Sequence, residues 1–139
     1  WKKLAEKNLL PGVGYEFHFY GVKSDGILAA EITRELKALP FEMTFHDHCG
    51  EFNLNGSIKH MASMDWFWAI DSSLLHYSRL IGIKTLSVFG PTSPQSLIKK
   101  LSYLEETILY EQIPCSPCVH VTEDPPCEGN NVCIQNLFS

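Results

Sequence analysis

The chain has 139 residues, of which 45% are hydrophobic and 19% charged, and its formal net charge is −5 at neutral pH. This composition is typical of a folded globular domain and argues against a disordered chain. The acidic balance, without a long block of lysine and arginine, argues against a nucleic-acid partner. No apolar run reaches the roughly 20 residues that a transmembrane segment needs.

Hydrophobic periodicity predicts helices and strands that alternate along the chain. Segments with apolar residues three and four apart indicate helices, and short runs rich in β-branched and aromatic residues indicate strands. The predicted helices cover 1–11, 24–39, 53–64 and 72–82, with one further turn in 93–101. The predicted strands cover 14–21, 42–50, 65–71, 83–90 and 106–112. This alternation predicts an α/β fold, with helices flanking a parallel sheet, and the remaining C-terminal residues are expected to form a loop.

The loop is rich in cysteine. Apart from Cys49, the cysteines of the chain are Cys115, Cys118, Cys127 and Cys133. An odd number of cysteines, without a secretory context, favours reduced thiols in a cytosol over a disulfide framework. The four clustered cysteines, with His120 as a fifth candidate, have the residue types of a structural zinc site, but the second pair lacks the usual two-residue gap. Reduced thiols that pack an irregular loop are the alternative, and the sequence leaves both open.

Polar residues follow the predicted strand at 65–71, where Asp71, Ser72 and Ser73 precede His76 on the next helix. In parallel sheets, ligands bind beyond the carboxyl ends of strands, and helix N-termini favour phosphates. Ser73 and His76 share one helix face, and Asp71 suits sugar hydroxyls. The opposite, core-facing side is expected to hold Leu74, Tyr77, Leu80 and Ile81. Helix capping alone also explains these residue types, so function and capping stay open.

A second polar turn follows the strand at 83–90. Gly90 permits close approach of another backbone, and Pro91 and Pro94 stiffen the turn. Thr92 and Ser93 offer hydroxyl groups to a phosphate or a sugar. A tight connecting loop without a ligand is the alternative interpretation.

The run His46-Asp47-His48-Cys49 has side chains that ligate metals. On a strand, however, His46 and His48 share one face while Asp47 and Cys49 take the other. We interpret the run as a polar strand terminus and His18, in the strand at 14–21, as a structural residue.

The segment IDSSLLHYSRLIGIKTLSVFGPTSP (70–94) resembles the Asp-Ser-Gly-x-x-His and Phe-Gly-x-Thr-x-Pro signature of glycosyltransferase family 9, the heptosyltransferase-like enzymes. Three further segments resemble the same family: FYGVKSD (19–25), the stretch from His46 to Ser73, and the Cys-containing tail. The resemblance implies a GT-B enzyme built from two Rossmann-like domains, of which this chain is the C-terminal one. Residues 1–112 would then form a nucleotide-sugar-binding domain, and residues 113–139 a Cys-rich loop packed on it.

The resemblance also implies site residues. Those that would contact the donor diphosphate are Ser72, Ser73 and His76. Those that would shape the pocket for the donor sugar are Asp71, Gly90 and Thr92. Gly21 and Asp25 would lie near the ribose or the base. The donor would be a nucleotide sugar, of which ADP-heptose is the best known in the family, and no metal or other cofactor would be required. The family commonly has glycine where this chain has Ser73.

The activity implied by the resemblance is inverting transfer to a lipid-linked envelope glycan, such as lipopolysaccharide, in a bacterium. The enzyme would lie in the cytoplasm or at the inner face of the cytoplasmic membrane. The family's carboxylate base belongs to its N-terminal domain, and its phosphate-binding lysine comes before the position of Trp1, so we expect this chain alone to bind donor without turnover. The alternative is a non-catalytic nucleotide- or phosphate-binding module with a zinc-stabilised Cys-rich contact surface.

Overall fold

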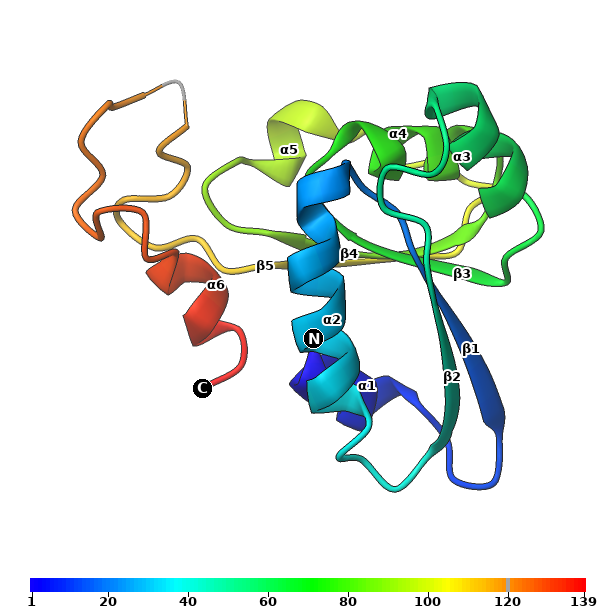
Figure 1. Cartoon of the computed structure of the whole chain (residues 1–139). Coiled ribbons are helices and arrows are strands. Elements are labelled where there is room, and N and C mark those ends of the chain that lie inside the picture. The colour runs from blue at the N-terminus through cyan, green and yellow to red at the C-terminus, as the bar shows by residue number, and fades with distance from the viewer. Residues whose placement is uncertain (120) are drawn as a thin grey trace. The chain divides into compact units, whose positions relative to one another are not determined.

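The computed structural model describes residues 1–119 and 121–139, and these residues form two compact units, Trp1–Ser57 and Ile58–Ser139. Each unit holds a sheet in which neighbouring strands run parallel, with helices between consecutive strands (Figure 1). The predicted α/β class with parallel strands is therefore confirmed. Among the described residues, the helices are too short or too polar to cross a membrane.

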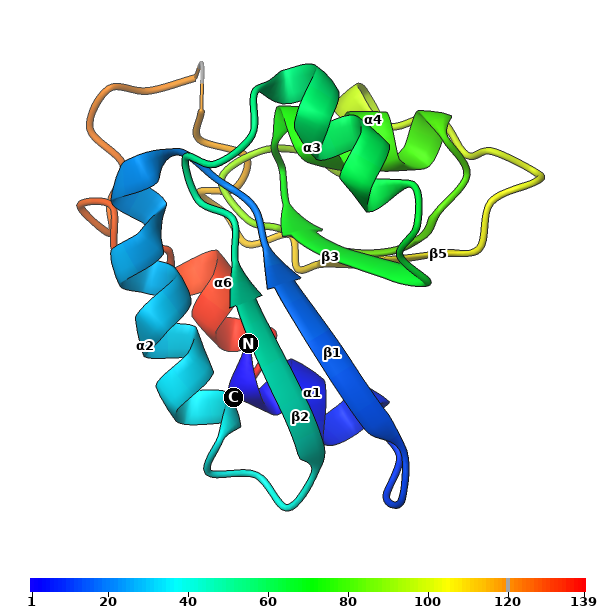
Figure 2. The ribbon, with the colours of Figure 1, turned by 45° about the vertical axis from the view of Figure 1, so that its right-hand side comes forward.

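The first unit, Trp1–Ser57, is built on two parallel strands. β1 (Gly14–Phe19) and β2 (Glu42–Asp47) pair along their whole length (Figure 2). Parallel neighbours need a crossover, and here a 3₁₀ turn, η1 (Lys23–Asp25), leads into α2 (Gly26–Leu36). The helix α1 (Lys2–Asn8) packs against α2. The buried apolar side chains of this unit are Leu4, Ala5, Leu9, Ala29, Leu36 and Leu39.

The second unit, Ile58–Ser139, contains a three-stranded parallel sheet. Its strands, in sheet order, are β3 (Trp66–Ile70), β4 (Lys84–Phe89) and β5 (Glu106–Tyr110). The crossover helices are α4 (Ser73–Leu80) and the short α5 (Pro94–Leu97), and α3 (Leu54–Met61) spans the boundary between the units. Residues 85–89 of the central strand are all buried, as expected for a parallel strand covered on both faces.

The predicted core face of α4 is wrong. Leu80 is 69% exposed and Ile81 41%, whereas Leu75, Ser78 and Arg79 are buried. The burial of Arg79 is the physical reason, because its side chain forms an ion pair with Glu106 at the start of β5. Because of this ion pair, α4 packs against the sheet with the face that carries Ser78 and Arg79, which the sequence pattern predicts to be solvent-exposed.

The prediction that the tail is entirely loop is also wrong, since residues 132–136 form α6 (Val132–Asn136). A helix of five residues depends on packing and not on its own propensity. Cys133 is buried, and a Cβ atom on Gly90 would lie 2.4 Å from Cγ1 of Ile134 and 2.9 Å from Sγ of Cys133. α6 therefore packs directly against the turn that follows β4, at a position where only glycine leaves room for it.

Candidate functional site

The polar residues that follow β3 meet at the N-terminus of α4. The Nε2 atom of His76 lies 3.5 Å from Oδ1 of Asp71, with the two side chains 41% and 23% exposed. Ser72 precedes the helix in an extended conformation, and its side chain makes no capping hydrogen bond. The Ser72 hydroxyl therefore does not cap the helix, and capping does not compete with ligand binding at this residue.

This arrangement suits an anion. The first backbone N–H groups of a helix lack partners within the helix, and the aligned peptide dipoles place partial positive charge at the same end. His76 is close enough to Asp71 for the carboxylate to orient the imidazole ring. The side chains of Ser72, Ser73 and His76 add donors beside the N–H groups of the helix, so the β3–α4 turn can hold a phosphate group.

The turn after β4 is held mainly by the tail. The Ser116 hydroxyl donates a hydrogen bond to the carbonyl of Gly90, and the amides of Cys118 and Val119 each donate to the carbonyl of Pro91 at 3.0 Å. The space beside Gly90 is filled by α6, so the close approach that this glycine permits is used within the chain. Its predicted contact with the donor sugar stays a prediction.

Thr92 in the same turn has an unusual environment. Its Oγ1 atom is buried, and among the described residues it has no hydrogen-bond partner. A buried hydroxyl without a partner costs roughly 1–3 kcal/mol, and such groups are rare in folded proteins. A ligand or a water molecule that reaches Thr92 would remove this cost, and the predicted contact of Thr92 with the donor sugar stays a prediction.

Gly21 and Asp25 build a compact turn in the first unit. The amide of Val22 donates a hydrogen bond of 2.9 Å to Oδ2 of Asp25, and a Cβ atom on Gly21 would lie 2.4 Å from that oxygen. The carboxylate therefore stabilises the turn, and only glycine fits at position 21. The predicted role of both residues beside a ribose or a base stays a prediction.

The cysteines are all free thiols. Burial raises the pKa of Cys133, and the charges of Cys118 and Cys127 raise it further. Over residues 1–119 and 121–139, no converging group of three or more potential metal ligands contains a cysteine. His120 lies outside the described residues, and the tail zinc site stays a prediction.

The thiols are expected to differ in reactivity. The backbone amide of Val132, aided by other amides of the same turn, lowers the pKa of Cys127, whereas burial raises the pKa of Cys133 and raises that of Cys49 to about 12. Because the thiolate is the nucleophile, Cys127 should react first with iodoacetamide near neutral pH, and Cys49 and Cys133 last. Peptide mass spectrometry in the presence of a chelator measures the order. Equal rates in the native protein would contradict the prediction, and in urea the rates should converge.

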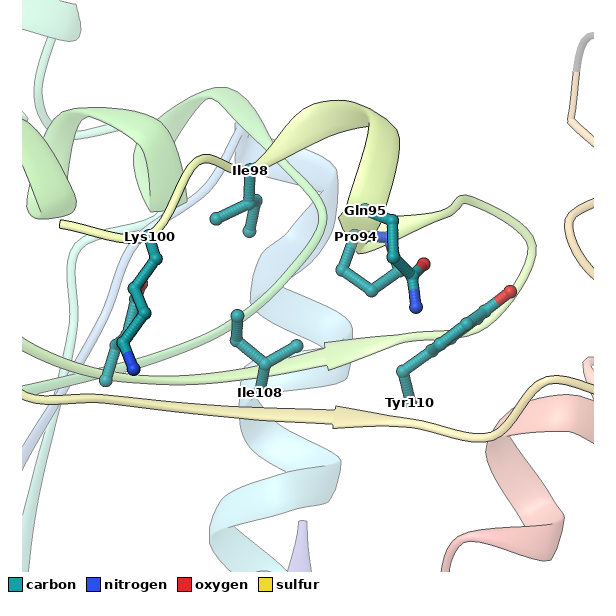
Figure 3. Close-up of a pocket in the computed structure, with 7 residues that line it drawn as sticks. Pro94, Gln95, Ile98, Lys100, Ile108 and Tyr110 are labelled. Atoms are coloured by element: carbon teal, nitrogen blue, oxygen red, sulfur yellow. The ribbon is translucent and has the colours of Figure 1, made fainter.

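A groove of about 500 Å³ lies beside β5 in the second unit, and no motif in the sequence indicates it. The side chains that line it are Pro94, Gln95, Ile98, Lys100, Glu106, Ile108 and Tyr110. Figure 3 shows Ile98 and Ile108 pointing toward each other across the groove. None of the lining residues belongs to the β3–α4 turn, so the groove and the turn are separate features.

Comparison with known families identifies a matching family. The model of a family described as glycosyltransferase family 9 (heptosyltransferase) matches residues 1–127. Neither the curated proteins nor the solved structures contain a match to this chain. The matched range includes both units' predicted site residues and reaches into the Cys-rich tail.

Proposed function

The chain belongs to glycosyltransferase family 9, the heptosyltransferase family, and from this premise we propose that it binds the diphosphate of a nucleotide-sugar donor at the N-terminus of α4. The observation that carries the proposal is the Asp71–His76 pair beside a helix start whose N-cap hydroxyl makes no capping bond. Ser72, Ser73 and His76 would contact the phosphate oxygens, and Asp71 would contact a sugar hydroxyl or orient His76.

The proposed reaction is inverting and independent of a metal. An acceptor hydroxyl, deprotonated by a carboxylate, attacks the anomeric carbon, and the bond from that carbon to the diphosphate oxygen breaks. The leaving nucleoside diphosphate gains negative charge as the bond breaks, and the amides of α4 with His76 would stabilise it. Electrostatic stabilisation by preorganised donors aimed at developing charge is usually the largest single contribution to catalysis.

We also propose contacts for the sugar and the nucleoside of the donor, and a class of acceptor. Thr92, whose buried hydroxyl lacks a partner among the described residues, would contact the sugar, and the Gly21–Asp25 turn would lie beside the ribose or base. The family resemblance assigns deprotonation of the acceptor to the other Rossmann-like domain of a GT-B enzyme. The acceptor would be a lipid-linked envelope glycan of a bacterium, reached from the cytoplasm.

Calorimetric titration tests the proposal. We expect one of ADP, UDP, GDP and CDP to bind in the presence of a chelator, and the variant His76→Ala to bind it about 10- to 100-fold more weakly. That range follows from the roughly 1.5–3 kcal/mol of a hydrogen bond to a charged group. His60→Ala, which removes a histidine from α3, is the matched control and should bind as the unmodified chain does. Unchanged affinity in His76→Ala, or no binding of any nucleotide at millimolar concentration, would overturn the proposal.

A further inference from the structure

One face of the β1–β2 pair gathers three histidines and two glutamates. Side chains alternate along a strand, which places Glu16 and His18 of β1 on one face. His46 of β2 lies on the same face, and the ring of His48, which directly follows β2, stacks beside that of His46. The register sets His18 directly opposite His46, and their rings stack with centroids 4.7 Å apart. Glu51 follows β2 and contacts His48. All five residues belong to the first unit.

The polar atoms of this histidine cluster form a continuous chain of contacts. Oε1 of Glu16 lies 2.9 Å from Nε2 of His46 and 3.1 Å from Nε2 of His18. Nδ1 of His18 lies 3.0 Å from Nε2 of His48, whose Nδ1 contacts Oε2 of Glu51. One atom each of Glu16, His18 and His46 therefore converges on a common point, and these three atoms lie within 4.8 Å of one another.

Counting protons shows that neutral histidines do not satisfy these contacts. Glu51 requires a proton on Nδ1 of His48, the contact between His48 and His18 requires one more, and Glu16 requires a proton on Nε2 of His18. Two neutral imidazoles carry two protons in total, and three are required. If the first two contacts are satisfied, the lone pair of His18 Nε2 faces a carboxylate oxygen. The contact is then favourable only with an additional positive charge.

We propose that a zinc ion supplies this charge, bound by Nε2 of His18, Nε2 of His46 and a carboxylate oxygen of Glu16. Imidazole and carboxylate are ligands that zinc accepts, and its bonds of about 2.0–2.1 Å set ligand atoms roughly 3.3 Å apart, close to the distances observed here. Metal-bound histidines characteristically donate their other N–H to an outer partner. The His18–His48–Glu51 chain provides that partner, and the exposed Glu16 and His46 leave the ion open to a water ligand.

This site goes beyond the proposed donor binding, whose phosphate and sugar contacts lie in the second unit and whose ribose or base contacts, Gly21 and Asp25, are other residues of the first unit. Zinc would join β1 to β2 and stabilise the first unit, because a ligand that binds only the folded state raises its stability. The expected observation is therefore a zinc-dependent rise in the unfolding temperature as well as binding itself.

The test uses the full chain with Cys115, Cys118 and Cys127 replaced by serine, so that the tail thiols do not compete. After chelator treatment, we expect calorimetry with ZnCl₂ to give one site of micromolar or tighter affinity. Glu16→Gln and His46→Ala are both exposed positions and should weaken zinc binding at least tenfold, whereas His76→Ala should not. Circular dichroism verifies that each variant is folded.

Two results would overturn the proposal. One is zinc binding that is absent or only millimolar in the folded serine background, which would mean that a protonated histidine supplies the charge. The other is tight binding that Glu16→Gln and His46→Ala leave unchanged, which would place the ion elsewhere. NMR provides a test that does not depend on affinity. If the ring-nitrogen signals of His18 and His46 shift on addition of zinc, both residues are supported as ligands.

Discussion

Replacing Arg79 by methionine is expected to lower the free energy of unfolding of the second unit by about 3–5 kcal/mol. Nε of Arg79 donates to Oε2 of Glu106 at 2.8 Å, and its Nη2 donates to the carbonyl of Lys99 at 2.6 Å. Both charged side chains are only 8% exposed. Removal of the guanidinium leaves a buried carboxylate without its counter-charge, which costs far more than the loss of a surface ion pair.

Urea unfolding followed by tryptophan fluorescence measures this loss, because Trp66 and Trp68 of β3 report on the second unit. Arg34→Met, at an exposed position of α2, is the matched control and should change stability by less than about 0.5 kcal/mol. The double variant Arg79→Met with Glu106→Gln should recover part of the loss, since the buried charge is then removed. A loss no greater than that of the control would contradict the prediction.

Arg79 also illustrates what the sequence can predict about this fold. The strands follow from local apolar runs, and the predicted 65–71 and 83–90 agree with β3 (Trp66–Ile70) and β4 (Lys84–Phe89) to within one residue at each end. The face that α4 buries depends on Glu106, which is 27 residues further along the chain. A helical periodicity carries no information about such a partner, so the predicted core face failed.

The two polar sites show the same division between local and distant information. Asp71 and His76 are five positions apart at a strand-to-helix junction, so their proximity could be predicted from the sequence. The histidine cluster depends on which residue of β1 pairs with which of β2, and only the register reveals that His18 lies opposite His46. The sequence did not predict α6. The helix begins after Asn131, which has a φ of 49°, and its burial depends on contacts with the Gly90 turn.

The Gly90→Ala variant is expected to destabilise the second unit by about 1–3 kcal/mol, the typical cost of overpacking a filled site. The new methyl group would fall 2.4 Å from Cγ1 of Ile134, so α6 must shift. Gly14→Ala is the matched control, because the nearest atom to its new methyl would be 3.9 Å away, and the backbone there is ordinary strand. The unfolding midpoint in urea, together with the rate at which iodoacetamide modifies the buried Cys133, measures both the stability and the displacement of α6.

A double-mutant cycle separates this collision from a general effect of losing glycine. If the methyl group that Gly90→Ala adds meets Ile134, then Ile134→Ala should relieve the strain, and the double variant should be more stable than the sum of the single changes by about 0.5–3 kcal/mol. Additive changes would mean that α6 does not rest on Gly90. The result also bears on donor binding, because the turn from Gly90 to Thr92 is held in place by the tail. If α6 positions Thr92, Gly90→Ala should weaken the binding of a nucleotide sugar. The binding of the nucleoside diphosphate alone, which we assign to the β3–α4 turn, should not change.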